Sequence, residues 1–209
     1  LRVLGACGVP TNTTIRVDNA ALEVAGSFRV GGRLELARGR VAAESAPGGF
    51  KDPRTAAFLP LWQRLFDRLA MAPRYLLALR DPGSVVRSFM AAYGAGAEEA
   101  ESVWLRRTGD ALWHTGARCH LVHYEDWFRR PAAMAAELAR FAGLAAPDPG
   151  RLSDLLAPLI RPDLDRSGPR RAGLADTEAR ALARALEDCR GDDFDRNRLL
   201  ELVGRGRRA

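Results

Sequence analysis

An arginine and a serine that follow a short apolar segment are the first candidates for chemistry. Arg80 comes directly after the apolar run Tyr75–Leu79, and Ser88 comes eight residues later. The run is typical of a buried parallel strand covered on both faces, and Asp81 with Pro82 is typical of a helix start. Arg80 and Ser88 could therefore bind one phosphate, helped by free N–H groups and the helix dipole. A strand–helix unit whose arginine only pairs with a carboxylate explains these residues equally well.

A second cation stands in a similar local pattern. Lys51 is the only lysine of the chain and precedes Asp52 and Pro53, just as Arg80 precedes an aspartate and a proline. If both cations end parallel strands, they lie at the same edge of one sheet. In open parallel sheets that carboxyl edge is where ligands bind.

The rest of the chain supplies the elements that would position these residues. Apolar periodicity predicts helices over 55–69, 97–115, 131–141 and 176–189, a strand over 118–123, and a polar tail after the last helix. The alternation of strands and helices predicts one α/β domain over 1–209, in which helices flank a parallel sheet in three layers. We divide it into a partial first unit with a substrate region (1–46), a core (47–145) and a helical C-terminal part with a basic loop (146–209).

Composition excludes several classes of protein. The net charge is +6, but arginines alternate with acids between 176 and 195, which argues against a nucleic-acid partner. The three cysteines are widely spaced and form no metal or redox motif, so we expect no metal and a reduced, cytoplasmic location. We expect no membrane span and no signal peptide. The sequence does not set the oligomeric state.

Taken together, these segments resemble the sulfotransferase family that uses 3′-phosphoadenosine-5′-phosphosulfate, in particular its bacterial branch. The resemblance runs from about residue 50 to about residue 143. It rests on Lys51-Asp52-Pro53-Arg54, on Arg80 with Ser88, and on Tyr124-Glu125-Asp126 with the helix that ends at Phe141-Ala142-Gly143. It implies an α/β core like that of the P-loop kinases, and transfer of a sulfuryl group to a hydroxyl or amine acceptor.

The resemblance also implies which residues bind the donor. Arg80 and Ser88 would bind its 3′-phosphate, for which the planar guanidinium is well suited. Tyr124 would lie near the adenine, although a tyrosine at a strand end is often only a packing residue. Arg166 is the residue that we choose from a late basic loop to reach the same phosphate. The product would be adenosine 3′,5′-bisphosphate. The sequence does not set the acceptor, and carbohydrate, lipid, small-metabolite and peptide hydroxyls all stay open.

One departure from the family concerns the start of the chain. Family members open with a strand and a glycine-rich loop that binds the 5′-phosphosulfate, whereas residues 1–9 resemble the helix after that loop. We therefore expect an N-terminally truncated domain. Two alternatives to an active enzyme follow: an inactive sulfotransferase remnant that keeps 3′-phosphate binding, and an arginine-rich binding module.

Catalysis requires a base for the acceptor's proton and a cation for the transferring group. In the counterpart of the family's catalytic segment, Asp52 is the candidate base and Lys51 the candidate stabilising cation. Asp52 also precedes a proline at a predicted helix start, where an aspartate is expected as a cap without any catalytic role. A base from the first 46 residues, such as Asp18 or Glu23, stays open.

Overall fold

Two parallel strands organise the part of the chain that the computed structural model describes, namely residues 55–144, 148, 154, 156, 157, 160 and 173–205. Seven helices accompany them within these residues. In chain order the elements are α4 (Thr55–Arg68), β1 (Tyr75–Leu79), α5 (Pro82–Tyr93), α6 (Ala97–Thr115), β2 (Cys119–His123), α7 (Asp126–Arg129), α8 (Pro131–Ala142), α10 (Thr177–Leu186) and α11 (Arg196–Arg205).

Strand β2 has hydrogen-bonded neighbours on both of its edges. It pairs with β1 in parallel, with Tyr75 opposite Cys119 and Leu79 opposite His123. On its other edge, the N–H groups of Leu121 and Gly191 donate to each other's carbonyls, at 2.8 and 2.9 Å. The turn before α11 therefore lies against β2 and brings its side chains close to the strand.

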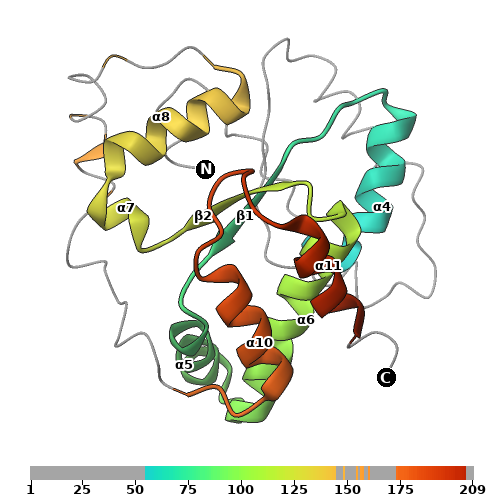
Figure 1. The fold of residues 1–209 in the computed structure, drawn as a ribbon, viewed down its shortest axis with the longest axis vertical. Helices are drawn as coiled ribbons and strands as arrows, with labels where there is room; N and C mark the ends of the chain where they lie inside the picture. Colours follow the sequence, from blue (N-terminus) through green and yellow to red (C-terminus); the bar gives the residue numbers. More distant parts are fainter. Residues whose placement is uncertain are drawn as a thin grey trace.

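Helices cover both faces of β2. Cys119 and Leu121 belong to a core formed with α5, α6, α10 and α11, whereas Val122 packs against Met134 and Leu138 of α8. Figure 1 shows α7 and α8 on one side of the strands and α5, α6 and α10 on the other. Complete burial of a leucine such as Leu121 contributes about 1.5–3 kcal/mol to stability.

Strand β1 differs from the sequence prediction, which expected it to be covered on both faces. Leu79 is buried and Leu77 packs against the core, but Leu76 is 38% exposed and Ala78 is also exposed. An unbroken apolar run cannot reveal this difference, because its side chains alternate between the two faces of the sheet whatever covers them. Only the face of β1 toward α5 and α6 is buried in the core.

Most helix boundaries agree with the sequence prediction. Helix α6 spans the predicted residues, and α8 begins at Pro131 and extends one residue beyond its predicted end. Each ends at a glycine in the left-handed region, Gly116 with φ of 58° and Gly143 with φ of 73°. This conformation carries no steric cost for glycine, which explains the sharp stops.

The prediction of a polar tail after the last amphipathic helix was wrong. Residues 196–205 form α11, in which Leu199 is 1% and Val203 is 9% exposed. Asp195 accepts a hydrogen bond from the Arg198 N–H at 3.0 Å near the start of this helix. The four-residue spacing of Leu199 and Val203 predicts one buried face, but the surrounding arginines obscured it.

The described residues thus form an α/β structure with a small parallel sheet. The larger sheet of the sequence prediction would include residues before Thr55, which lie outside them. Among the described helices, none combines the length and the apolar character that crossing a membrane requires.

Candidate functional site

Arg80 and Tyr124 come together at the carboxyl edge of the two strands. Each residue directly follows the last residue of its strand, and those two last residues lie opposite each other in the parallel register. The guanidinium carbon of Arg80 lies 5.0 Å from the centre of the Tyr124 ring. A cation over an aromatic face is a favourable electrostatic contact. The structure thus unites two residues that are 44 positions apart in the sequence and that the resemblance assigns to one ligand.

The two serines of α5 have very different surroundings. Ser84 is 3% exposed, and its hydroxyl accepts a hydrogen bond from the Arg87 guanidinium at 2.9 Å. Ser88, which the sequence assigns to the phosphate, is exposed one turn further along the helix. Ser84 is thus buried in the first turn of α5, whereas Ser88 faces solvent.

The start of α5 is capped more completely than the sequence predicted. Asp81 accepts a hydrogen bond from the Ser84 N–H at 2.7 Å, as expected of a capping aspartate. The N–H of Asp81 itself donates to Glu125 Oε1 at 2.9 Å. Two carboxylates thus already lie at the positive end of this helix. The positive charge that could attract an anion at this edge is therefore that of the arginine side chain more than that of the helix N-terminus.

Three of the predicted site residues lie outside the described part of the chain. They are the candidate catalytic pair Lys51 and Asp52 and the loop residue Arg166. Their roles stay predictions. Of the cofactor-binding set, the structure describes Arg80, Ser88 and Tyr124.

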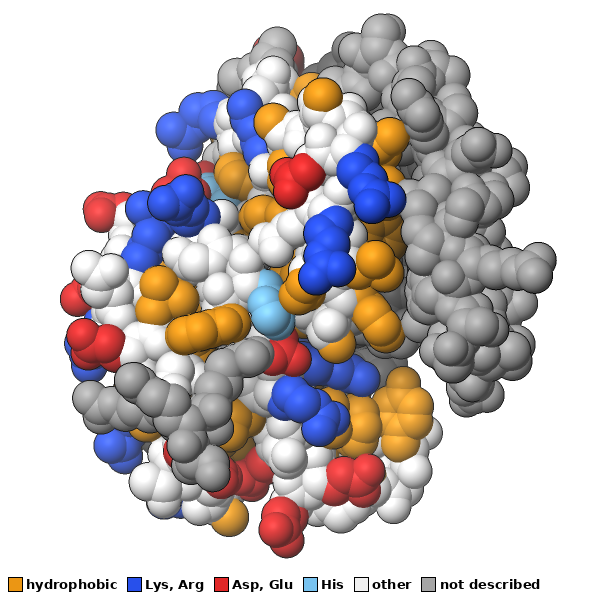
Figure 2. Space-filling model, turned by 90° about the vertical axis from the view of Figure 1, so that its right-hand side faces the viewer, with side chains coloured by type: hydrophobic (Ala, Val, Ile, Leu, Met, Phe, Trp, Pro, Cys, Tyr) orange, Lys and Arg blue, Asp and Glu red, His pale blue; other side chains and the backbone are white. Residues whose placement is uncertain are grey.

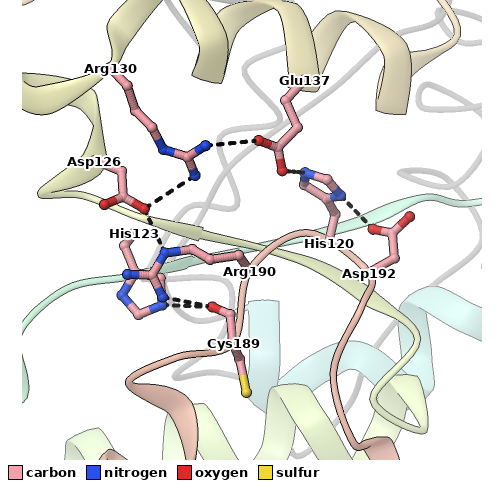
Figure 3. A network of polar contacts seen from close by, with 8 residues as sticks. All are labelled: His120, His123, Asp126, Arg130, Glu137, Cys189, Arg190 and Asp192. Carbon is pink, nitrogen blue, oxygen red and sulfur yellow. Dashed lines mark hydrogen bonds and ion pairs between the residues drawn. The ribbon is translucent and has the colours of Figure 1, made fainter.

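A network of polar and charged side chains, which sequence reasoning missed, includes buried His120 and buried Asp126 (Figure 3). This histidine is 5% exposed, and its Nδ1 lies 2.5 Å from Asp192 Oδ1 in the turn before α11. Its Nε2 lies 3.2 Å from Glu137 Oε1 of α8 without forming a hydrogen bond. The ring also stacks on Phe141, with the centres 4.6 Å apart. His120 thus joins α8 to the turn before α11.

The network continues through Asp126 at the start of α7. Arg190 Nε donates to Asp126 Oδ2 at 2.6 Å, and Arg130 lies 3.5 Å from the same oxygen. Burial alone would raise the pKa of Asp126, but the hydrogen bond and charge of Arg190, together with Arg130, hold that pKa below its ordinary value. Asp126 is therefore ionised near neutral pH and links Arg190 to the start of α7.

His123 is neutral in this arrangement. Burial, reinforced by the positive charge of Arg190, lowers the pKa of His123 below 6.5. Its Nε2 lies 2.9 Å from the Cys189 carbonyl oxygen, which can only accept, so this nitrogen carries the proton. The two histidines of β2 therefore have separate partners. Within the described residues, no group of three or more His, Cys, Asp or Glu side chains could hold a metal ion.

Burial affects the acidity of both described cysteines. Burial raises the pKa of Cys119 to about 11, and burial also raises the pKa of Cys189. Both side chains are buried thiols in the core. Because the thiolate is the reactive form, the raised pKa values disfavour these thiols as nucleophiles.

A hollow of about 520 Å³ lies at the opposite end of β2 from Arg80. Its walls come from the end of α6, the residue before β2, and the first turn of α11: His114, Thr115, Gly116, Arg118, Arg196, Asn197 and Leu200. None of the site residues that the structure describes, Arg80, Ser88 and Tyr124, lines it. The candidate site is therefore an arrangement at the carboxyl edge and not this hollow.

Comparisons with models of protein families, with curated proteins and with solved structures gave no match.

Proposed function

We propose that this chain binds the 3′-phosphoadenosine portion of 3′-phosphoadenosine-5′-phosphosulfate and transfers its sulfuryl group to a hydroxyl or amine acceptor. The single observation that carries the proposal is the contact between Arg80 and Tyr124 at the carboxyl ends of two paired parallel strands. A guanidinium offers paired donors to a phosphate, and an aromatic ring offers a surface for a base. Ligands of open parallel sheets bind at this edge.

The described residues fit the 3′-phosphate end of such a donor. Arg80 would bind the phosphate, while Arg87 holds the Ser84 hydroxyl beside the same helix start. Arg80 lies over the Tyr124 ring, and the Phe128 ring packs against it with the centres 5.1 Å apart, so an adenine would contact the part of the Tyr124 ring that these two side chains leave exposed. The donor, when bound, supplies the sulfuryl group. We propose that Lys51 stabilises the negative charge on that group and that Asp52 accepts the acceptor's proton.

An arginine-rich nucleic-acid module is the less favoured function. Such a module needs a continuous basic surface. On the face drawn in Figure 2, the basic side chains are separated by acidic and hydrophobic ones and do not gather into a stripe. The charge pattern between 176 and 195 has the same mixed character in the sequence.

Thermal unfolding with adenosine 3′,5′-bisphosphate tests the proposal. We expect the nucleotide to raise the Tm, because a ligand at one hundred times its Kd stabilises a protein by about 2.7 kcal/mol. Arg80→Ala should abolish the shift, and adenosine 5′-monophosphate, which lacks the 3′-phosphate, should give a smaller one. Arg180→Ala is the matched control, since Arg180 also lies beside a helix start but donates to the backbone there.

Two results would count against the proposal: no shift for the unaltered chain, or an equal shift for Arg80→Ala. Transfer is measured separately, as release of adenosine 3′,5′-bisphosphate from the donor in the presence of a panel of hydroxyl and amine acceptors. Binding without release would favour the inactive remnant.

A further inference from the structure

The cap of α5 is completed by a residue far away in the sequence. In a local capping box, the side chain of the cap residue accepts from the N–H of the third helical residue, and that residue's own side chain accepts from the cap N–H. Here Asp81 accepts from the N–H of Ser84, but the Asp81 N–H donates to Glu125. Glu125 lies 44 residues further along the chain and is 8% exposed. The box is thus shared between the ends of β1 and β2.

Two hydrogen bonds between the strand ends enclose Arg80. The N–H of Tyr124 donates to the carbonyl of Leu79 at 2.8 Å, and the N–H of Asp81 donates to Glu125 at 2.9 Å. Arg80 lies between Leu79 and Asp81, and Tyr124 directly precedes Glu125. The residue before Arg80 is therefore bonded to the backbone of Tyr124, and the residue after Arg80 is bonded to the side chain of Glu125.

We propose that Glu125 is a positioning residue that holds Arg80 over Tyr124 for a nucleoside 3′-phosphate. This inference rests on the function proposed above and assigns a role to a residue that does not contact the ligand. The carboxylate acts through the Asp81 N–H, which fixes the direction in which the chain leaves β1. Loss of this bond frees the turn, and the guanidinium no longer meets the phosphate in one defined geometry.

The competing explanation is that Glu125 is only a structural cap. The molecule contains the matched control for this alternative at the start of α10. There Asp176 accepts from the Ala179 N–H at 2.6 Å and donates its own N–H to buried Glu101 at 2.8 Å. Glu101 and Glu125 thus make the same bond to a capping aspartate, but only Glu125 adjoins Arg80 and Tyr124.

Isothermal titration with two nucleotides separates the explanations. Adenosine 3′,5′-bisphosphate and adenosine 5′-monophosphate are titrated into the full chain and into Glu125→Ala, Glu125→Gln and Glu101→Ala, at a temperature where circular dichroism shows each to be folded. We expect Glu125→Ala to weaken the bisphosphate at least tenfold and the monophosphate less than twofold. Glu125→Gln retains a carbonyl acceptor and should stay within threefold, and Glu101→Ala should match the unaltered chain.

The outcomes also distinguish this inference from the proposed function. If the unaltered chain does not bind the bisphosphate, both fail. If it binds and Glu125→Ala binds equally well, or weakens both nucleotides by the same factor, only the positioning role fails. Should Glu125→Ala not fold, Glu125→Asp, whose carboxylate is one methylene shorter, makes the same comparison and should also weaken the bisphosphate selectively.

Discussion

Helices α5 and α10 begin with the same construction. In each, an aspartate accepts from the N–H of the third helical residue, and the aspartate's own N–H donates to a buried glutamate from a distant element. The glutamates are Glu125, which follows β2, and Glu101 on α6. Such a cap provides acceptors for backbone N–H groups that have no partner within the helix.

The two caps differ in what surrounds them. Beside α10, the guanidinium of Arg180 donates to the carbonyls of Leu174 and Ala175 and to the Thr177 hydroxyl, at 2.8, 2.6 and 3.0 Å. Arg180 therefore stabilises the turn before α10. Beside α5, Arg80 lies over the ring of Tyr124 at the sheet edge. A capped helix start is therefore not a ligand site by itself; the neighbouring side chains make the difference.

Replacing the two glutamates should cause the largest losses of stability, and the two losses should differ. Glu101 accepts two backbone N–H groups, from Ala175 and Asp176, whereas Glu125 accepts the one from Asp81. A hydrogen bond to a charged group contributes about 1.5–3 kcal/mol, so the loss of two bonds in Glu101→Ala should lower the free energy of unfolding by about 3–6 kcal/mol, and Glu125→Ala should lower it by about half of that. Urea unfolding measures both. Equal losses would show that the second bond to Glu101 adds nothing.

Replacing the two capping aspartates should cause smaller losses of stability that are equal to each other. Replacing a capping aspartate by alanine costs about 1 kcal/mol, and the geometry of Asp81 and Asp176 is alike. Asp81→Ala and Asp176→Ala should therefore have similar midpoints of urea unfolding, and the asparagine variants, which keep an acceptor oxygen, should retain most of the stability. A large difference between the alanine variants would mean that the two caps are not equivalent.

Acid should produce the smallest effect, through the residue that follows Glu125. The folded pKa of the next residue, Asp126, lies below its ordinary value of 3.8, so its ionised form stabilises the folded state above that pH. This contribution is lost as the pH falls below 3.8 through the folded pKa. Between pH 5 and pH 3 the Tm should fall more steeply for the unaltered chain than for Asp126→Asn. Parallel curves would contradict the role of the bond between Asp126 and Arg190.

Local sequence signals predicted the elements that depend on local chemistry. Asp81 with Pro82 predicted the start of α5, and α6 and α8, which end before Gly116 and Gly143, ended at the predicted residue and one residue beyond it. These signals were sufficient because a cap or a left-handed glycine acts within one turn of its own position. Helix α11 was missed because its narrow apolar face lies among arginines.

By itself the sequence placed Arg80 and Tyr124 at strand ends and predicted a ligand edge. Only the tertiary structure decided that they touch, that Glu125 completes the cap beside them, and that His120 lies between Glu137 and Asp192. It also decided that Ser88 faces solvent while Ser84 is buried. The physical reason is the separation along the chain over which each effect acts. Backbone preferences are set by neighbours in the chain, whereas burial and pairing of charged groups are set by residues that folding brings together from 44 to 75 positions away.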